Sequence, residues 1–268
     1  MTDISLLVLG LGWTGQFITQ QCAAQKVAYA ATTRDGRHGT LAWTLTDEPD
    51  VSTLPPARTV LVTFPVLSGP AMEKLMTAYE AKHSTKPHWI LLSSTRPFSS
   101  NPLPVSDRHS PMMPNDRTPA EEVTLVHQGT VLHLAGLWGA QRQPRNWVAR
   151  FSTEEAIRAK LLTRQLHLIH GQDVARAILA VHEQPRGGRW IVTDRGCQDW
   201  IRLFLTWASS DQLILARRLA HEDEACRTAL HNATLEEAVA RGNVQPASDS
   251  REFWDTFGLE PTKFLKVE

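Results

Sequence analysis

The sequence predicts an α/β fold built on a doubly wound parallel sheet, and three observations predict it. Short apolar runs alternate with helical stretches, which is the pattern of parallel strands joined by crossover helices. The first apolar run, residues 4–9, leads straight into a glycine-rich turn, Gly10-Leu-Gly-Trp-Thr-Gly15. The length of 268 residues is ample for one such core with a smaller appended lobe.

The expected elements follow in chain order. Strands are predicted at 4–9, 27–32, 59–64, 88–92, 130–135 and 189–193. Helices are predicted at 16–25, 70–83, 120–127, 173–182, 198–208, 211–220 and 234–241, with Asp173 as the cap of its helix. Residues 96–119 contain six prolines, so we expect a long irregular loop of the kind that often forms a functional lid.

The glycine-rich turn has the spacing of a dinucleotide site in a Rossmann-type fold. Gly10 permits the tight turn, Gly12 lets the backbone approach a pyrophosphate, and Gly15 lets the helix pack closely on the strand. The helix N-terminus offers an anion free N–H groups and a partial positive charge. An ordinary strand–helix turn is the alternative, but the flanking strand and helix favour nucleotide binding. Trp13 and Thr14, between the glycines, belong to the same expected site.

The end of the second strand indicates which dinucleotide is bound. NAD-selective folds place a carboxylate here to accept from the ribose 2′-hydroxyl. This chain has Thr33 and Arg34, and Arg34, with Arg37 nearby, can pair with a 2′-phosphate. We therefore expect NADP. Asp35 offers a competing interpretation, since a shift of one residue in register places an acid at the ribose and favours NAD. The simplest alternative is that Arg34 is a solvated surface arginine with no ligand.

Composition narrows the class of protein. Lys and Arg together number 28, as do Asp and Glu, so no basic surface for nucleic acid or an anionic membrane is expected. The three cysteines are scattered without metal-site spacing, and no metal is predicted. The first apolar run has no charged leader and is too short to span a bilayer. We expect a soluble, cytoplasmic protein with a small-molecule substrate; a monomer and a homodimer agree with this equally.

Four further segments, taken with the glycine turn, carry a family resemblance. They are Leu92-Ser-Ser-Thr95, Leu134-Ala-Gly-Leu-Trp-Gly139, Arg142, and Leu168-Ile-His-Gly-Gln-Asp-Val-Ala-Arg176. In this order the set resembles the atypical and extended short-chain dehydrogenase/reductase superfamily, in its NAD(P)-binding, epimerase/dehydratase-like branch. The resemblance implies a nucleotide-binding core over 1–135. It also implies a mainly substrate-binding lobe over 136–268, which includes the late elements of the sheet within a single compact unit.

The resemblance also implies where a nicotinamide would lie. Phe64 and Pro65 at one strand end and Ser93 at another would flank it. Ser94 matches the family's active serine, whose hydroxyl would orient a substrate carbonyl; the alternative is a Ser/Thr cluster that satisfies free backbone groups. Thr95 and Arg96 follow directly and are candidate substrate contacts.

The sequence departs from the family at its proton donor. Members that transfer hydride carry a Tyr-x-x-x-Lys helix after the serine strand, where lysine lowers the tyrosine pKa. Here Tyr29 lies in a strand, Tyr79 precedes Ser94 with Lys82 three residues on, and Phe98 replaces the tyrosine of the strand-end motif. The usual acid is therefore missing, and His170 and Asp173 match a turn that serves the fold.

The segment 138–147 combines indoles, guanidiniums and an amide just beyond a predicted strand end, where open α/β sheets bind ligands. Trp138, Arg142 and Trp147 are its candidate substrate contacts; core packing is the alternative for the tryptophans. Two functions remain. One is an NADP-dependent oxidoreductase or epimerase-like enzyme acting on a small organic, secondary-metabolite type of molecule. The other is a non-redox protein that keeps the nucleotide as structure: a redox sensor, or an isomerase or cyclase.

Overall fold

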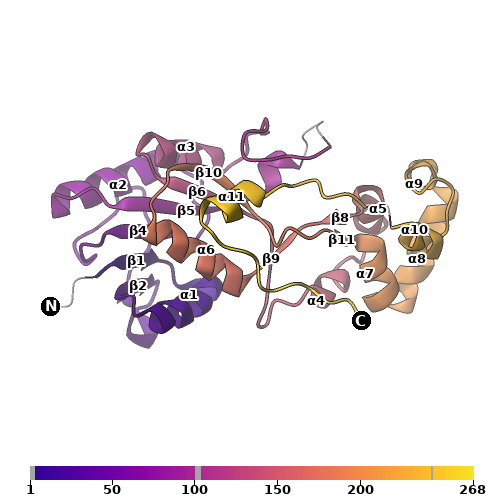
Figure 1. The fold of residues 1–268 in the computed structure, drawn as a ribbon, viewed down its shortest axis with the longest axis horizontal. Coiled ribbons are helices and arrows are strands. Elements are labelled where there is room, and N and C mark those ends of the chain that lie inside the picture. The colour runs from indigo at the N-terminus through magenta and orange to yellow at the C-terminus, as the bar shows by residue number, and fades with distance from the viewer. Residues whose placement is uncertain (1–3, 100–103, 243) are drawn as a thin grey trace.

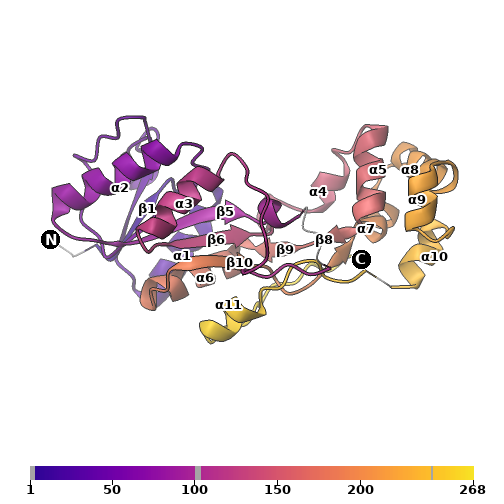
Figure 2. The ribbon, with the colours of Figure 1, turned by 90° about the horizontal axis from the view of Figure 1, so that it is seen from above.

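The computed structural model describes residues 4–99, 104–242 and 244–268. The molecule is elongated, with a parallel sheet flanked by helices at one end and a group of helices at the other (Figures 1 and 2). Among the described residues, no helix combines the length and apolar character needed to cross a membrane.

The sheet has seven strands in the order β10-β6-β5-β4-β1-β2-β3, and all neighbours run parallel. The strands are β1 (Leu6–Leu9), β2 (Tyr29–Thr33), β3 (Leu41–Ala42), β4 (Thr59–Val62), β5 (His88–Ser94), β6 (Thr130–Leu134) and β10 (Gly188–Val192). The chain adds β2 and β3 on one side of β1 and then restarts with β4 on the other side. This reversal is the switch point where such sheets bind ligands, at the carboxyl ends of β1 and β4.

Helices cover both faces of the sheet, because its strands are apolar on both faces. All four residues of β1 are buried, as are those of β4. The helices α1 (Gly12–Gln25) and α6 (Gly171–Glu183) pack on one face, and α2 (Gly69–His83) and α3 (Thr118–Val126) pack on the other. The predicted doubly wound fold is thus confirmed.

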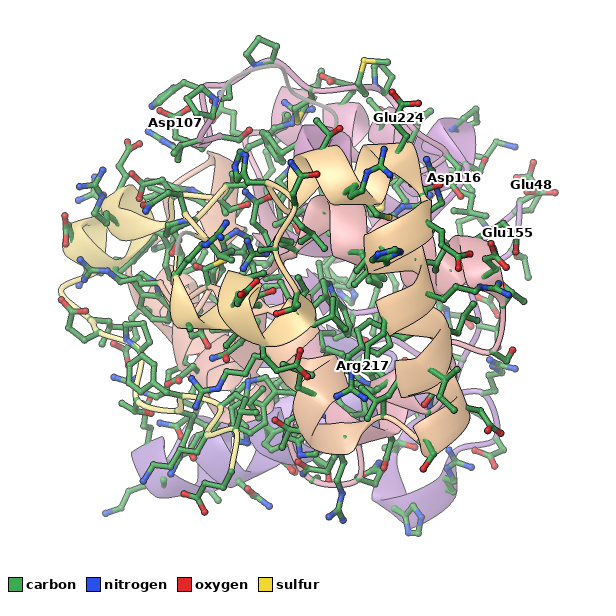
Figure 3. All side chains as sticks on the ribbon, turned by 90° about the vertical axis from the view of Figure 1, so that its right-hand side faces the viewer. Glu48, Asp107, Asp116, Glu155, Arg217 and Glu224 are labelled. Carbon is green, nitrogen blue, oxygen red and sulfur yellow. The ribbon has the colours of Figure 1, made fainter. Side chains whose placement is uncertain are left out.

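The far end of the molecule is a helical lobe with its own core. It contains α4 (Arg145–Val148), α5 (Glu154–Thr163), α7 (Trp200–Trp207), α8 (Ser210–Glu222), α9 (Glu224–Ala229) and α10 (Leu235–Ala240). Two small sheets lie before it: β7 (Gly136–Trp138) with β9 (Leu168–His170), and β8 (Gln165–Leu166) with β11 (Gln198–Asp199). Charged side chains, including Arg217 and Glu224, cover the outer face of the lobe (Figure 3).

The chain crosses between the two ends more than once. After α5 it returns to the sheet to form α6 and β10, and after α10 it returns again as α11 (Arg251–Thr256). Phe253 and Trp254 of α11 pack in the same core cluster as Trp190 of β10. The last residues come back to the helical lobe, where Leu265 and Val267 pack against its core.

Several element boundaries differ from the sequence prediction. Helix α1 begins at Gly12, not at residue 16, so the glycine turn is itself the first helical turn. Helix α6 is capped by His170, whose Nδ1 accepts from the N–H of Gln172 at 3.1 Å, and the predicted Asp173 cap is wrong. Helix α5 was not predicted, although Thr153 caps it and two acidic residues occupy its first turn.

The proline-rich loop is irregular, as predicted, apart from a short 3-10 turn at Arg96–Phe98. Its residues 100–103 lie outside the described residues. Beyond them, Ser106 is bound on both sides: its N–H donates to Ala247 at 2.9 Å, and its carbonyl accepts from Asp249 at 2.8 Å. The described part of the loop is therefore tied to the segment before α11.

Candidate functional site

The glycine-rich turn brings the ends of β1, β2 and β4 together. Gly10 has a positive φ of 86°, and a Cβ there would lie 2.7 Å from the ring of Phe64. Its N–H donates to Thr32 Oγ1 at 2.9 Å, and Thr63 Oγ1 donates to its carbonyl. Only glycine fits this close approach.

The turn leaves space and hydrogen-bond donors for an anion. A Cβ on Gly12 would meet no heavy atom within 4 Å, so the backbone there faces open space. Helix α1 begins at this residue without a side-chain cap and without an acidic residue in its first turn. Free N–H groups and the helix dipole thus point at the opening. These residues fit the pyrophosphate of a dinucleotide. A Cβ on Gly15 would lie 2.5 Å from the side chain of Leu11, in the connection between β1 and α1.

The two candidate ribose contacts after β2, Arg34 and Asp35, differ in whether they already have partners. Asp35 accepts from Thr33 Oγ1 at 3.1 Å and lies 3.7 Å from an Arg37 nitrogen, and the Thr33 bond lowers its pKa. Arg34 is exposed directly after the strand. The ion pairs of the described residues engage other arginines and leave Arg34 uncommitted.

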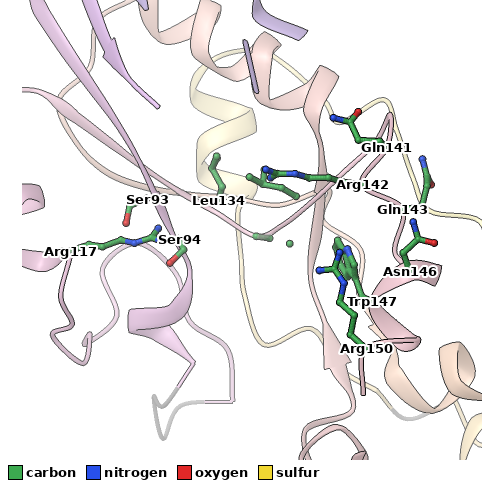
Figure 4. Close-up of a pocket in the computed structure, with 13 residues that line it drawn as sticks. Ser93, Ser94, Arg117, Leu134, Gln141, Arg142, Gln143, Asn146, Trp147 and Arg150 are labelled. Atoms are coloured by element: carbon green, nitrogen blue, oxygen red, sulfur yellow. The ribbon is translucent and has the colours of Figure 1, made fainter. Parts of the chain in front are cut away.

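A cavity of about 700 Å³ opens at the carboxyl ends of β5 and β6 (Figure 4). It is lined by Ser93, Ser94, Arg117, Leu134, Ala135, Gly136, Leu137, Gln141, Arg142, Gln143, Asn146, Trp147 and Arg150. The serines and Arg117 stand on one side, and Arg142, Trp147 and Arg150 on the other (Figure 4). The predicted contacts Ser93, Ser94, Arg142 and Trp147 therefore share one cavity.

The cavity lining is positively charged. It includes Arg117, Arg142 and Arg150 and no carboxylate. The ion pairs that the described residues form engage other arginines, so these three charges remain available. Arg117 extends toward Ser94, whose buried Oγ has no hydrogen-bond partner within the described chain (Figure 4). A polar group in this condition is costly unless a ligand completes it.

Arg142 connects the cavity with the glycine turn. Its guanidinium carbon lies 4.4 Å from the centre of the Trp13 ring, within the range of a cation–π contact. Trp13 in turn packs edge-on against Phe17 at 4.9 Å, and Phe17 against His170 at 5.5 Å. The candidate nucleotide and substrate contacts are thus neighbours.

Three predicted substrate contacts do not line this cavity. Thr95 lies beyond the strand end, where its N–H donates to the Leu134 carbonyl at 3.2 Å. Arg96 is exposed at the start of the 3-10 turn. Trp138 packs edge-on against His170 at 4.7 Å in β7. Alternation explains this last position, because the side chains of neighbouring β7 residues point to opposite faces and Leu137 is the one that lines the cavity.

The two tyrosines are far from any proton-transfer role. Tyr79 is fully buried and donates to the Pro55 carbonyl at 2.7 Å, and burial raises its pKa to about 12. Its neighbour Lys82 donates to backbone carbonyls of residues 51, 52 and 54. Tyr29 begins β2, at the end of the sheet opposite the cavity.

Asp173 of the matched turn, and His167 just before this turn, bond to other segments of the fold. Asp173 is fully buried and accepts from the backbone of Thr262 and Lys263, both at 2.9 Å, which anchors the C-terminal segment. His167 Nδ1 donates to the Gly196 carbonyl at 3.1 Å, and its Nε2 accepts from the Ala247 N–H at 3.0 Å. The described residues contain no cluster of three or more His, Cys, Asp or Glu that could hold a metal ion.

A buried polar cluster lies behind the two serines, and sequence reasoning did not find it. Ser93 Oγ donates to Glu121 Oε1, and Glu121 Oε2 lies 3.8 Å from His133 Nε2. His133 Nδ1 donates to the Ser94 carbonyl at 2.9 Å. Both Glu121 and His133 are fully buried. Arg117 and Arg150 were missed as well, since neither belongs to a spaced motif.

Neither a scan against protein-family models nor a search of curated proteins finds a match for this sequence. Solved structures do match. UDP-N-acetylglucosamine 4-epimerase from Bacillus cereus is 11% identical, with 97% of this chain and 94% of that chain covered, at a TM-score of 0.62. Vestitone reductase from alfalfa is 14% identical, with 97% of this chain and 94% of that chain covered, also at a TM-score of 0.62. A short-chain dehydrogenase/reductase superfamily protein from Agrobacterium tumefaciens, solved with bound NAD, is 13% identical. The match covers 97% of this chain and 93% of that chain, at a TM-score of 0.63. The resemblance predicted from the sequence is confirmed at the level of the fold: this chain has the fold of the short-chain dehydrogenase/reductase and NAD-dependent epimerase/dehydratase proteins.

Proposed function

We propose that the chain is an NADP-dependent oxidoreductase or epimerase-like enzyme acting on a small organic molecule that carries an anionic group. The observation that carries this proposal is the contact between Arg142 and Trp13. It sets a cationic cavity directly beside an uncapped, glycine-rich helix N-terminus. The enzymes of the same fold named above support it.

The nucleotide half of the proposal rests on three features. The backbone at Gly12 faces open space, the first turn of α1 offers free N–H groups, and Arg34 is uncommitted beside the end of β2. The turn would bind the pyrophosphate, and Arg34 would pair with a 2′-phosphate. When bound, a nicotinamide dinucleotide supplies or accepts a hydride at the substrate carbon.

The substrate half rests on the cavity. Trp147 gives it an apolar wall, and Arg117, Arg142 and Arg150 attract a carboxylate or phosphate. Ser94 Oγ, which has no partner of its own within the described chain, donates to a substrate oxygen, and Arg117 beside it stabilises negative charge that develops there.

A non-redox protein with a structural nucleotide is the second candidate, and the positions of Tyr29 and Tyr79 favour it. Absorbance of the reduced nicotinamide separates the two candidates. The purified protein is mixed with NADPH and matched carbonyl compounds that have or lack a carboxylate or phosphate. Stoichiometric loss of NADPH with the charged members supports the enzyme. Product formation without consumption of NADPH supports the second candidate, and absence of NADPH binding by calorimetry rejects both.

The anionic preference has its own matched pair of variants. Arg117→Gln removes a cavity charge, whereas Arg96→Gln removes an exposed charge outside the cavity. The first should raise KM for a charged substrate about tenfold or more, the scale of a hydrogen bond to a charged group, and leave an uncharged substrate nearly unchanged. Equal effects of the two variants would contradict an anion site at Arg117.

A further inference from the structure

The missing tyrosine leaves the proposed reaction without a proton donor, and the cluster behind the serines is placed to supply one. Ser93 lines the cavity, while its hydroxyl is bonded to Glu121 Oε1. A single hydroxyl therefore separates the cavity from a fully buried carboxyl group.

Two atoms of the cluster have no hydrogen-bond partner within the described part of the chain: Glu121 Oε2 and His133 Nε2. They face each other at 3.8 Å. Since the Ser94 carbonyl accepts from Nδ1, that nitrogen carries a hydrogen. A neutral ring then presents a bare lone pair at Nε2. An ionised Glu121 would add a second set of lone pairs and an unpaired buried charge, which is strongly unfavourable.

The surroundings decide where an additional proton resides. The groups that face His133 are Glu121 on α3, Ser93 and Ser94 on β5, Arg189 on β10, and the Phe98 ring, whose centroid lies 5.2 Å from that of His133. Burial lowers the pKa of His133, and Arg189 lowers it further, against the opposing effects of Glu121 and the Ser94 carbonyl. Burial therefore disfavours an imidazolium at His133.

We propose that Glu121 and His133 hold one shared proton and that Ser93 connects it to the cavity, where it takes the place of the missing tyrosine. The storage of the proton rests on the two facing atoms and on the burial of both side chains, whereas its delivery to a substrate rests on the proposed function. Glu121 and Ser93 are the donors in this scheme, and His133 is a positioning residue that keeps the proton on the carboxyl group.

Delivery of the proton balances without a further reactant. For delivery, the carboxyl group of Glu121 rotates so that the protonated oxygen faces Ser93, whose hydroxyl donates to Oε1 in the structure. Ser93 then turns its hydroxyl hydrogen to an oxygen anion in the cavity and takes the carboxyl hydrogen from Glu121 in the same movement. One O–H bond forms on the substrate oxygen and one breaks at Glu121. The negative charge passes from the substrate to the Glu121 carboxylate, and the reverse transfer, or a proton from solvent in the emptied cavity, restores the acid.

Infrared spectroscopy of the nucleotide-free protein tests the storage. At about pH 8, where Asp194 with its pKa of about 6 is ionised, the wild type should show a protonated-carboxyl band. Glu121→Gln should lose this band. The control Glu155→Gln removes an exposed carboxylate of α5 in the helical lobe, outside the cluster, and it should keep the band. Thermal unfolding identifies any variant that fails to fold.

Nitrogen NMR of labelled histidine completes the proton count in the wild type, so the proposal does not depend on a variant. A neutral His133 ring together with the protonated-carboxyl band supports the proposal. An imidazolium facing a carboxylate overturns it, because the proton then lies on His133 and not on the acid that Ser93 contacts. A neutral ring with no protonated-carboxyl band overturns it.

Exchange into heavy water tests the connection to the cavity. If Ser93 is the exit, the carboxyl band should shift on exchange severalfold more slowly in Ser93→Ala than in the wild type. An unchanged exchange rate would overturn the route through Ser93. None of these measurements uses nucleotide or substrate, so failure of the proposed function, seen as absent NADPH binding, is distinguishable from failure of this inference.

Discussion

The nucleotide turn and the cavity lie on the same edge of one sheet but are assembled in different ways. The nucleotide turn is made by elements that follow one another directly in the chain: the end of β1, the start of α1 and the end of β2. The cavity takes its wall from β5, the start of α3, the end of β6, β7 and α4. Its charged residues Arg117 and Arg150 are separated by two strands. The comparison teaches that backbone requirements leave a local record in the sequence, whereas a side-chain constellation does not.

The largest expected effect separates the two regions. Gly12→Val places a branched side chain where the backbone faces open space, so NADPH binding should be lost in calorimetric titration. The positive φ of 38° also strains the variant by about 1–2 kcal/mol. Gly258→Val is the control, because Gly258 has φ 61° and equally open space but lies after α11. Nucleotide affinity that survives in a folded Gly12→Val protein would remove the nucleotide site.

The next effect concerns the cavity alone. Ser94→Ala should lower turnover by a factor of about 10² to 10³, as expected when a donor to a developing oxyanion is removed, and should leave NADPH affinity unchanged. Tyr29→Phe and Tyr79→Phe should stay within a few-fold. Tyr79→Phe should cost about 0.5–1.5 kcal/mol of stability through its lost bond to Pro55. A large turnover defect in Tyr79→Phe would show that tyrosine catalysis was wrongly excluded.

Arg142 is the residue that can break the comparison, since it lines the cavity and stacks on Trp13. Arg142→Gln should raise KM for an anionic substrate about 10- to 100-fold, which corresponds to roughly 1.5–3 kcal/mol of lost binding free energy. It should also change nucleotide affinity by about 0.5–2 kcal/mol through the lost stacking. Arg150→Gln is the control, which should affect the substrate only. If Arg142→Gln leaves nucleotide binding intact, the two regions are independent.

The smallest effect sharpens the nucleotide side. Arg34→Ala should weaken NADPH by roughly 1–3 kcal/mol, the range of a charge-assisted bond, and hardly change NADH. Arg37→Ala should have less effect, because Asp35 already engages Arg37 at 3.7 Å. Calorimetric titration with both dinucleotides measures the difference. Equal affinities of the wild type for NADPH and NADH would contradict the NADP preference.

Much of the sheet could be predicted from the sequence, and the helical lobe only in part. The strands are continuous apolar runs, and burial on both faces enforces that pattern. The predicted Asp173 cap failed because α6 begins earlier, at Gly171, with His170 as its N-cap. The Asp173 carboxylate lies inside the first turn and accepts from residues 262 and 263, which return from the far end of the chain. Helix α5 was missed even though Thr153 and its acidic first turn carry a start signal.

The sequence by itself determined the parallel sheet, the glycine turn at Gly10–Gly15 and the absence of a family tyrosine after Ser94. These depend on backbone geometry and on residue types at short spacing, which a linear pattern records. Only the tertiary structure decided that Arg117 faces Ser94, that Arg142 rests on Trp13, and that Glu121 and His133 meet behind Ser93. Those contacts join strands and helices that are distant along the chain, and the packing of the sheet, not the spacing of residues, brings them within bonding distance.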